Sequence, residues 1–184
     1  MSIQDTLGTL ANNLRSASGY QNKLSLADMS SMATGLTTYN LLPNTTSKVK
    51  DLSVDSNQWA VILYDNVKLP AGIYTYSIYV DLTNGHNSTS NRVEWTDTSG
   101  VNKALDTSSP AWGAFSNNWI LAGNKGLVSV TFQLGVADTI NIGLSGHPYT
   151  KGTFKYARPM LNVGTFPLPY TSNTLVRGGG EVQV

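Results

Sequence analysis

The feature that most restricts the fold of this chain is a two-residue alternation of apolar and polar side chains. It recurs in short runs after Asn40 and is clearest in the segment IYTYSIYVDL, residues 73–82. One face of that segment carries Tyr74, Tyr76, Ile78, Val80 and Leu82, and the other carries Thr75, Ser77, Tyr79 and Asp81. Because side chains alternate between the two faces of a β-strand, this pattern predicts a strand with one buried face.

Similar runs follow at intervals along the chain, separated by turns rich in Gly, Asn and Pro. They are WAVILY (59–64), RVEWT (92–96), LVSVTFQL (127–134), TINIGL (139–144) and a strand that begins at Phe154. About eight short strands with such turns predict an antiparallel β-sandwich. The expected core is Tyr74, Tyr76, Ile78, Val80, Val128, Val130, Phe132, Ile140, Ile142 and Phe154, and we also expect Trp59 and Trp95 inside. The segment 97–124 has no clear strand pattern and is expected to be a long loop.

The first 36 residues predict a helical hairpin instead. Ile3, Leu7, Leu10, Ala11 and Leu14 form one apolar stripe at helical spacing. Ser2 is placed to cap this helix, with the carboxylate of Asp5 in its first turn, and a second helix is expected from Ser25 to Gly35. A hairpin of this size cannot bury a core of its own, so the stripe predicts docking or oligomerisation.

The chain therefore divides into a hairpin (1–36), a β-sandwich (37–172) and a Gly-rich C-terminal tail (173–184). The run RPMLNVGTFPLPY near the end of the sandwich is rich in proline. Since proline lacks a backbone donor, this run should end the sheet ladder, and Tyr170 should fold back as an amphipathic plug.

Composition excludes several classes of function. The net charge of +1 gives no electrostatic attraction to nucleic acid or to acidic membranes. The absence of cysteine excludes thiol catalysis and cysteine metal sites. No apolar run approaches the ~20 residues of a membrane span, and the N-terminus lacks the pattern of a signal peptide. A surface of Ser, Thr, Asn and Gly with only 12% charged residues suits an extracellular β-protein. If the protein works outside cells, it reaches the outside by a route other than secretion, such as assembly in the cytoplasm followed by lysis.

Two parts of the chain resemble a known family. LANNLRSASGYQNKLSLADMSSMATGL, residues 10–36, resembles the N-terminal helical hairpin of tail and baseplate proteins from phages of Gram-positive bacteria. RPMLNVGTFPLPY (158–170) and YTYSIYV (74–80) resemble strands of the carbohydrate-binding-module-like jelly rolls in the same proteins. Asn162 stands where that family commonly has a carboxylate, and residues 97–124 have no counterpart in it.

This resemblance implies a virion protein of the phage tail tip or baseplate, with a jelly-roll sandwich and other baseplate proteins as partners. It also implies a homotrimer, because threefold assembly is common in the family. The implied function is adhesion to a cell-wall polysaccharide of the host. It implies no cofactor, although a structural calcium ion held by backbone carbonyls is compatible with such jelly rolls.

The candidate saccharide site rests on aromatic and hydrogen-bonding side chains. Rings of Trp and Tyr stack on the C–H faces of sugars, while Asn, Asp, Glu and Arg bond the hydroxyls. If the loop Thr83–Asn91 is a hairpin, the strands on either side of it become neighbours. The candidate residues are then Tyr79, Asp81, Arg92 and Glu94, with Trp112 or Trp119 reaching over from the long segment.

Three alternatives stay open at this stage. The chain could be a purely structural baseplate subunit whose aromatic face packs on a neighbour. It could be a glycan-cleaving enzyme that uses paired carboxylates from Asp81, Glu94 and Asp97. We favour the simpler explanation that these carboxylates only keep the surface soluble, and we expect no enzyme. His86 and His147 could bind a metal, although loop histidines are far more often solvated.

Overall fold

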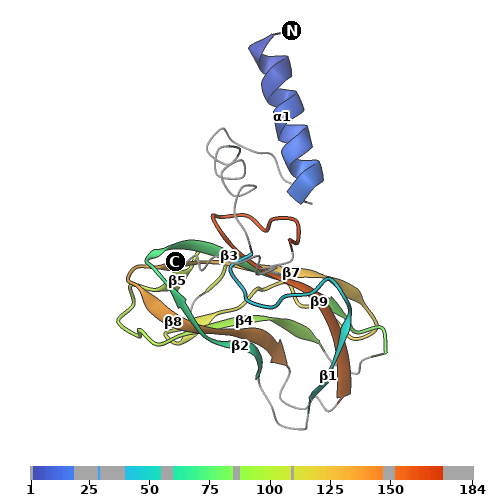
Figure 1. Ribbon diagram of the computed structural model, residues 1–184, viewed down its shortest axis with the longest axis vertical. Coiled ribbons are helices and arrows are strands. Elements are labelled where there is room, and N and C mark those ends of the chain that lie inside the picture. The colour runs from blue at the N-terminus through green and yellow to red at the C-terminus, as the bar shows by residue number, and fades with distance from the viewer. Residues whose placement is uncertain are drawn as a thin grey trace, which may run out of the picture.

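The computed structural model describes residues 2–18, 29, 40–54, 60–84, 88–108, 110–146 and 152–171 (Figure 1). In this part of the chain one helix, α1 (Ile3–Ser18), stands apart from two stacked antiparallel sheets. The strands are β1 (Lys50–Val54), β2 (Ala60–Leu69), β3 (Gly72–Asp81), β4 (Thr89–Trp95), β5 (Lys103–Ala104), β6 (Gly113–Ala114), β7 (Lys125–Leu134), β8 (Asp138–Gly146) and β9 (Gly152–Val163).

The sheet topology is that of a jelly roll. One sheet has the order β1-β9-β3-β7-β5 and the other has the order β2-β8-β4-β6. The strands therefore pair from the outside of the sequence inward: β1 with β9, β2 with β8, β3 with β7 and β4 with β6. Since successive strands alternate between the two sheets, each crossover closes one end of the sandwich. This arrangement confirms the predicted mainly-β sandwich.

The predicted core is confirmed wherever its side chains are described. Tyr74, Tyr76, Ile78 and Val80 of β3 are buried, as are the predicted residues of β7 and β8. Trp95 is also buried, and its ring lies 6.5 Å from that of Phe132. Trp59 and the side chain of Phe154 lie outside the described residues.

The outer face of the five-stranded sheet is not open, contrary to the alternation of residues 73–82. Thr75 and Ser77 were expected in solvent but are fully buried, and so is Thr131 on β7. Residues 164–171, which we call the strap, lie across this face on the side where α1 stands (Figure 1). The Thr75 hydroxyl donates to the Gly164 carbonyl at 2.8 Å, and the Gly164 N–H donates to Ile73 at the same distance. The prediction failed because the covering segment comes about 90 residues later in the chain.

The strap is held by Asn162, the residue that stands where the resembling family often has a carboxylate. Its side-chain amide donates to the Phe166 carbonyl at 2.9 Å, and its oxygen accepts from the Leu168 N–H at 3.3 Å. A carboxylate could not donate the first of these bonds, so the amide is suited to this fold-back. Phe166 and Leu168 are the buried plugs, while Tyr170 is half-buried and its hydroxyl donates to Thr45.

The segment 97–124 is built into the sandwich and is not a free loop. It supplies β5 to one sheet and β6 to the other, and Ile120 forms a β-bridge with Thr89. Between these points the Ser116 N–H donates to the buried side chain of Asn91 at 2.9 Å. The strands were missed because β5 and β6 have two residues each, which is too short for an alternation to be visible.

The first helix is confirmed, including its cap. The Asp5 N–H donates to the Ser2 hydroxyl, and the Ser2 N–H donates to the Asp5 carboxylate. On the apolar stripe, Leu7 and Ala11 pack against Met29 and Phe166 of the strap. Ile3 and Leu10 stay 81% and 41% exposed, so the stripe is only partly covered within one chain. Apart from Met29, the predicted second helix lies outside the described residues, as does the tail 173–184.

Candidate saccharide-binding surface

Three of the six predicted site residues come together on the outer face of the four-stranded sheet. Arg92 and Glu94 project outward from β4 because Val93 and Trp95 on the same strand point into the core. The Arg92 Nε donates to the Glu94 carboxylate at 2.6 Å. The Arg92 guanidinium carbon lies 4.0 Å from the centroid of the Trp112 ring, a cation–π contact.

A fourth residue, Phe115, completes this surface. Its ring stacks near that of Trp112, with centroids 6.2 Å apart and planes 18° from parallel. Trp112 keeps 37% of its surface exposed. We call Arg92, Glu94, Trp112 and Phe115 the Trp112 surface. Sequence reasoning missed Phe115, because only the two-residue strand β6 between the two rings brings them onto one surface.

The backbone around Trp112 is fixed by its neighbours on β4. The Trp95 N–H donates to the Trp112 carbonyl at 3.1 Å, and the Trp95 indole N–H donates to Ala111 at 2.8 Å. Gly113, the next residue, passes so close to β4 that a Cβ there would overlap the carbonyl oxygen of Val93. The tryptophan ring is therefore held by a rigid support rather than by a loop tip.

The Trp112 surface carries groups of the kinds that can contact a sugar ring. It offers a partly exposed indole, an ion pair and an aromatic neighbour on one outward face. In the described structure the guanidinium of Arg92 uses only Nε for a hydrogen bond, which leaves its two terminal nitrogens as donors. Because Arg92 covers one face of the indole, a sugar would contact the exposed remainder of the ring while its hydroxyls bond Arg92 and Glu94.

Tyr79 and Asp81 do not join this surface, contrary to the hairpin hypothesis. They lie on β3 in the five-stranded sheet, whereas Arg92 and Glu94 lie on β4 in the other sheet. The connection between β3 and β4 crosses from one sheet to the other and does not make a hairpin. For the same reason Asp81 and Glu94 do not share a face, so the carboxylate pair considered for a glycan-cleaving enzyme is not formed.

Asp81 belongs instead to a row of alternating charge across four strands. The register places Asp51 beside Lys155, Lys155 beside Asp81, and Asp81 beside Lys125. Hydrogen bonds from Thr83 lower the pKa of Asp81, and the two lysines lower it further. Opposite charges at neighbouring positions favour this strand register, which is a structural role.

Trp119 lies apart from Trp112. Segment 113–120 runs along β4, with Gly113 beside Glu94 and Ile120 beside Thr89. Trp112 and Trp119 therefore flank opposite ends of the strand, roughly 17 Å apart at ~3.4 Å per residue. Trp119 is half-buried and lies outside the Trp112 surface.

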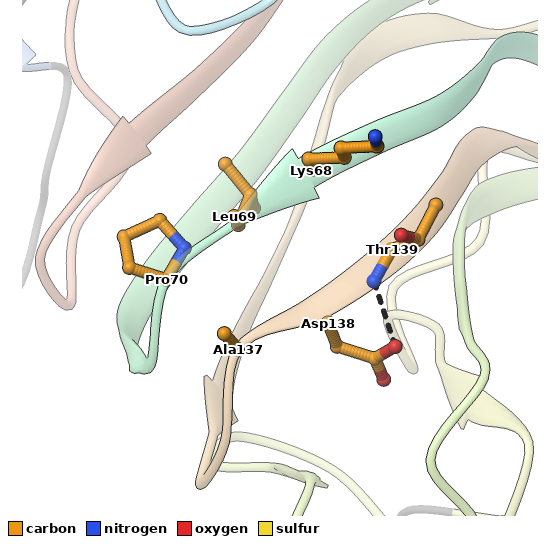
Figure 2. A pocket seen from close by; sticks show the side chains of 6 residues that line it. All are labelled: Lys68, Leu69, Pro70, Ala137, Asp138 and Thr139. Atoms are coloured by element: carbon orange, nitrogen blue, oxygen red, sulfur yellow. Dashed lines mark hydrogen bonds between the residues drawn. The ribbon is translucent and has the colours of Figure 1, made fainter. Parts of the chain in front are cut away.

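A shallow hollow of about 450 Å³ lies between the end of β2 and the start of β8 and includes Asp138 (Figure 2). Figure 2 shows the Asp138 carboxylate directed away from Leu69 and Pro70. This carboxylate accepts hydrogen bonds from five donors: Thr96 N, Thr96 Oγ1, Asp97 N, Asn102 Nδ2 and Thr139 N. Asp138 thus anchors the start of segment 97–124. Its carboxylate oxygens already accept hydrogen bonds from within the protein.

Asp138 should make the protein sensitive to acid. Burial alone would raise the pKa of Asp138, but the hydrogen bonds from Thr96, Asp97 and Thr139 outweigh it and hold the pKa below its ordinary value of 3.8. The stabilisation is therefore present above pH 3.8 and is lost as the pH falls through the lowered pKa. We expect Asp138→Asn to lower the free energy of unfolding at pH 7 by about 1–2 kcal/mol, since the group is partly open to solvent.

Urea denaturation from neutral to acidic pH measures this effect. The gap between wild type and Asp138→Asn should close as the pH falls. Asp51→Asn on β1 is the matched control, because it removes one carboxylate without removing these hydrogen bonds. A gap that stays constant with pH would contradict the anchoring role of the Asp138 charge.

Metal and membrane sites were also sought. Within the described ranges, no group of three or more His, Cys, Asp or Glu side chains could hold a metal ion. His86 and His147 lie outside those ranges. None of the helical segments that the structure describes is long and apolar enough to span a membrane.

Comparison with known proteins gives one weak structural match. No family model matches the chain, and no curated protein matches it. The chain is similar to a chain in the structure of the tripod (BppUct-A-L) from the baseplate of bacteriophage Tuc2009, with a TM-score of 0.37 and 17% sequence identity. The alignment covers 72% of this chain and 57% of that chain. The chain thus spans little more than half the length of the matched protein, and a similarity this low carries no conclusion about function.

Proposed function

We propose that this protein is a structural and adhesion subunit of a phage tail tip or baseplate, and that its jelly roll binds a cell-wall saccharide of the host. The virion role is supported by the resemblance of residues 10–36 and 158–170 to tail proteins of phages that infect Gram-positive bacteria. The saccharide role is supported by one observation above all: an exposed Trp112 held rigidly beside Arg92 and Glu94.

Binding by a single surface of this kind is weak. One stacked ring and a few hydrogen bonds in competition with water give a Kd of roughly millimolar to micromolar. Several copies on one virion then supply avidity without any further contact. Adhesion therefore needs both the Trp112 surface on the jelly roll and an assembly of several copies, which the N-terminal region drives.

Trp112→Ala should weaken binding to cell walls by about tenfold or more, because it removes the stacking ring and the partner of Arg92. Trp112→Phe should keep part of the binding, because a smaller ring remains. The measurement is retention on isolated cell walls of Gram-positive bacteria, with circular dichroism to confirm the fold of each variant. Leu121→Ala removes another exposed apolar side chain (58% exposed) and should bind as wild type.

The competing role is a scaffold subunit whose Trp112 surface packs on a neighbouring baseplate protein. Wall binding that is unchanged in Trp112→Ala would contradict the adhesion proposal and favour this scaffold. The glycan-cleaving enzyme has no comparable support from the described geometry, because its candidate carboxylates Asp81 and Glu94 lie on different sheets.

We propose a homotrimer assembled through the apolar stripe of α1. Ile3 and Leu10 are exposed although they continue the stripe of Leu7 and Ala11, and a second copy of the helix would remove them from water. The double variant Ile3→Asp/Leu10→Asp should be a monomer by light scattering. Thr9→Asp/Asn12→Asp adds the same charge on the polar face and should stay trimeric. A monomeric full-length protein at micromolar concentration would refute the proposal.

A further inference from the structure

A second pocket lies at the opposite edge of the sandwich from the Trp112 surface. It has a volume of about 300 Å³ and is lined by residues that include Asn44, Lys50, Leu63, Tyr64, Asp65 and Tyr156. We call it the tyrosine pocket. Its walls come from the edge strands β1 and β2, from β9 and from the turn before β1, so it opens where the two sheets meet. The Trp112 surface adjoins β6, at the other edge of the four-stranded sheet.

The local backbone shapes this pocket. β2 loses its regular register with β8 on both sides of Tyr64, between Ile62 and Tyr64 and again between Tyr64 and Val67. Asn44 and Asn66 have positive φ angles of 52° and 55°. These angles turn the chain sharply before β1 and within β2. Bulges and such turns change the direction of side chains at a sheet edge. Here they lie beside the hollow between the edge strands β1 and β2.

A buried polar group with no hydrogen-bond partner in the described structure lies in the core against which Tyr64 and Tyr156 pack. The Tyr76 side chain points into the sandwich and is fully buried, and its hydroxyl forms no hydrogen bond within the described structure. Burial raises the pKa of Tyr76 first, and the neighbouring Tyr64 and Tyr156 raise it further. Tyr64 and Tyr156 pack against the core that contains Tyr76 and also line the pocket, whereas Tyr76 itself does not line it. A buried hydroxyl without a partner is unfavourable, so the Tyr76 hydroxyl costs stability and is not a ligand contact.

The lining indicates the chemistry of a ligand that would fit this pocket. Burial raises the pKa of Tyr64 to about 12, with smaller effects of Tyr156 and Tyr170, so its hydroxyl is a neutral donor at physiological pH. Lys50 and Asp65 supply one positive and one negative charge, which leaves the lining with no net charge. Hydroxyl, amide and charged groups of both signs around aromatic rings suit a neutral polyhydroxy ligand. The volume stands near the lower end of ligand pockets, about 300–1,000 Å³, which suits a small ligand.

We propose that the tyrosine pocket binds a single neutral pyranose residue, with the Tyr64 and Tyr156 side chains as its principal contacts. The pocket would take a chain end or a branch of a saccharide, whereas the Trp112 surface stacks on an exposed ring. This inference does not depend on the Trp112 surface, because the two sites share no residue and lie at opposite edges of one sheet.

The test uses saturation-transfer NMR with the full-length protein and a panel of methyl glycosides: glucose, galactose, rhamnose and N-acetylglucosamine. At least one should receive saturation, with a Kd in the roughly millimolar range expected for one sugar residue. Tyr156→Phe keeps the ring and removes the hydroxyl, and it should weaken that binding by about tenfold. Tyr74→Phe makes the same change at a hydroxyl bonded to Pro70 outside the pocket and should bind as wild type.

Tyr64→Phe removes the second hydroxyl of the lining and should weaken binding as Tyr156→Phe does, with circular dichroism to confirm the fold. Tyr76→Phe removes a buried hydroxyl that has no partner and does not line the pocket, so it should leave binding unchanged and the melting temperature unchanged or higher. Trp112→Ala should leave binding of the methyl glycoside unchanged, which distinguishes failure of this site from failure of the adhesion surface. The proposal is wrong if no glycoside of the panel receives saturation, or if neither Tyr156→Phe nor Tyr64→Phe weakens binding.

Discussion

Gly143→Ala is expected to lower the free energy of unfolding by about 3 kcal/mol or more. Gly143 lies in the middle of β8, between Ile62 of β2 and Arg92 of β4. A Cβ at this position would overlap the carbonyl oxygen of Val61 and lie 2.8 Å from its carbon. These are backbone atoms next to a register shift of β2, so they can yield only if the strand pairing itself changes.

The matched control for this variant is Gly126→Ala on β7. A Cβ at Gly126 would meet only the terminal carbon of the Ile120 side chain, at 3.0 Å, and that flexible end can move aside. For a domain of this size a loss of 3 kcal/mol lowers the melting temperature by roughly 6–12 °C. Equal denaturation midpoints for Gly143→Ala and Gly126→Ala would contradict the close approach of β2 to β8.

Asn40→Ala is the second large effect, with an expected loss of about 3–5 kcal/mol. The buried Asn40 side chain joins the start of the sandwich to its end. Its amide donates to the Pro159 carbonyl at 2.8 Å, and its oxygen accepts from the Leu161 N–H at 3.0 Å and the Leu42 N–H at 3.1 Å. Alanine would leave these backbone groups buried without the partner that Asn40 provides.

Asn40→Asp tests whether the amide group itself is required. An aspartate could still accept from Leu42 and Leu161, but it could not donate to the carbonyls of Pro159 and Thr171. We expect it to be nearly as destabilised as Asn40→Ala in urea titrations. Asn124→Ala is the control, because the exposed Asn124 amide makes only one long bond of 3.4 Å to Ala122. A loss below about 1 kcal/mol for Asn40→Ala would contradict this account.

The sequence predicted the strands and the core well because the physical signal was local. Tyr76, Val80, Val130 and Ile142 were assigned to the interior from alternation alone, and all are buried. The first helix and the cap by Ser2 were predicted for the same reason. Both depend on residues within one or two turns of each other, so no knowledge of the tertiary fold was needed.

What the sequence could not predict depends on contacts between distant segments. Strands adjacent in sequence often pair, which made Tyr79 and Arg92 look like neighbours. In a jelly roll they lie in different sheets, so the predicted site contained residues from two separate surfaces. Likewise, Thr75 is buried only because the strap returns to cover it. Trp112 was a candidate from the sequence and keeps part of its ring exposed, but its contacts with Arg92 and Phe115 could be seen only in the structure.

The tyrosine pocket illustrates the same limit. Tyr64 and Tyr156 come from two strands, β2 and β9, and each looks like an ordinary core residue in its own segment. Only the bulges of β2 and the position of β1 bring them together around a hollow. No local pattern distinguishes such tyrosines from those that complete a core.

The most direct test of the proposed adhesion role is co-sedimentation of the full-length protein with isolated cell walls of Gram-positive bacteria. One sample keeps its wall polysaccharide, and in a matched sample the polysaccharide has been extracted. If the jelly roll is a saccharide-binding module, the protein will pellet with intact walls of a susceptible host and stay in the supernatant with extracted walls. Equal sedimentation with both samples, or none with any wall that carries its polysaccharide, would contradict saccharide binding.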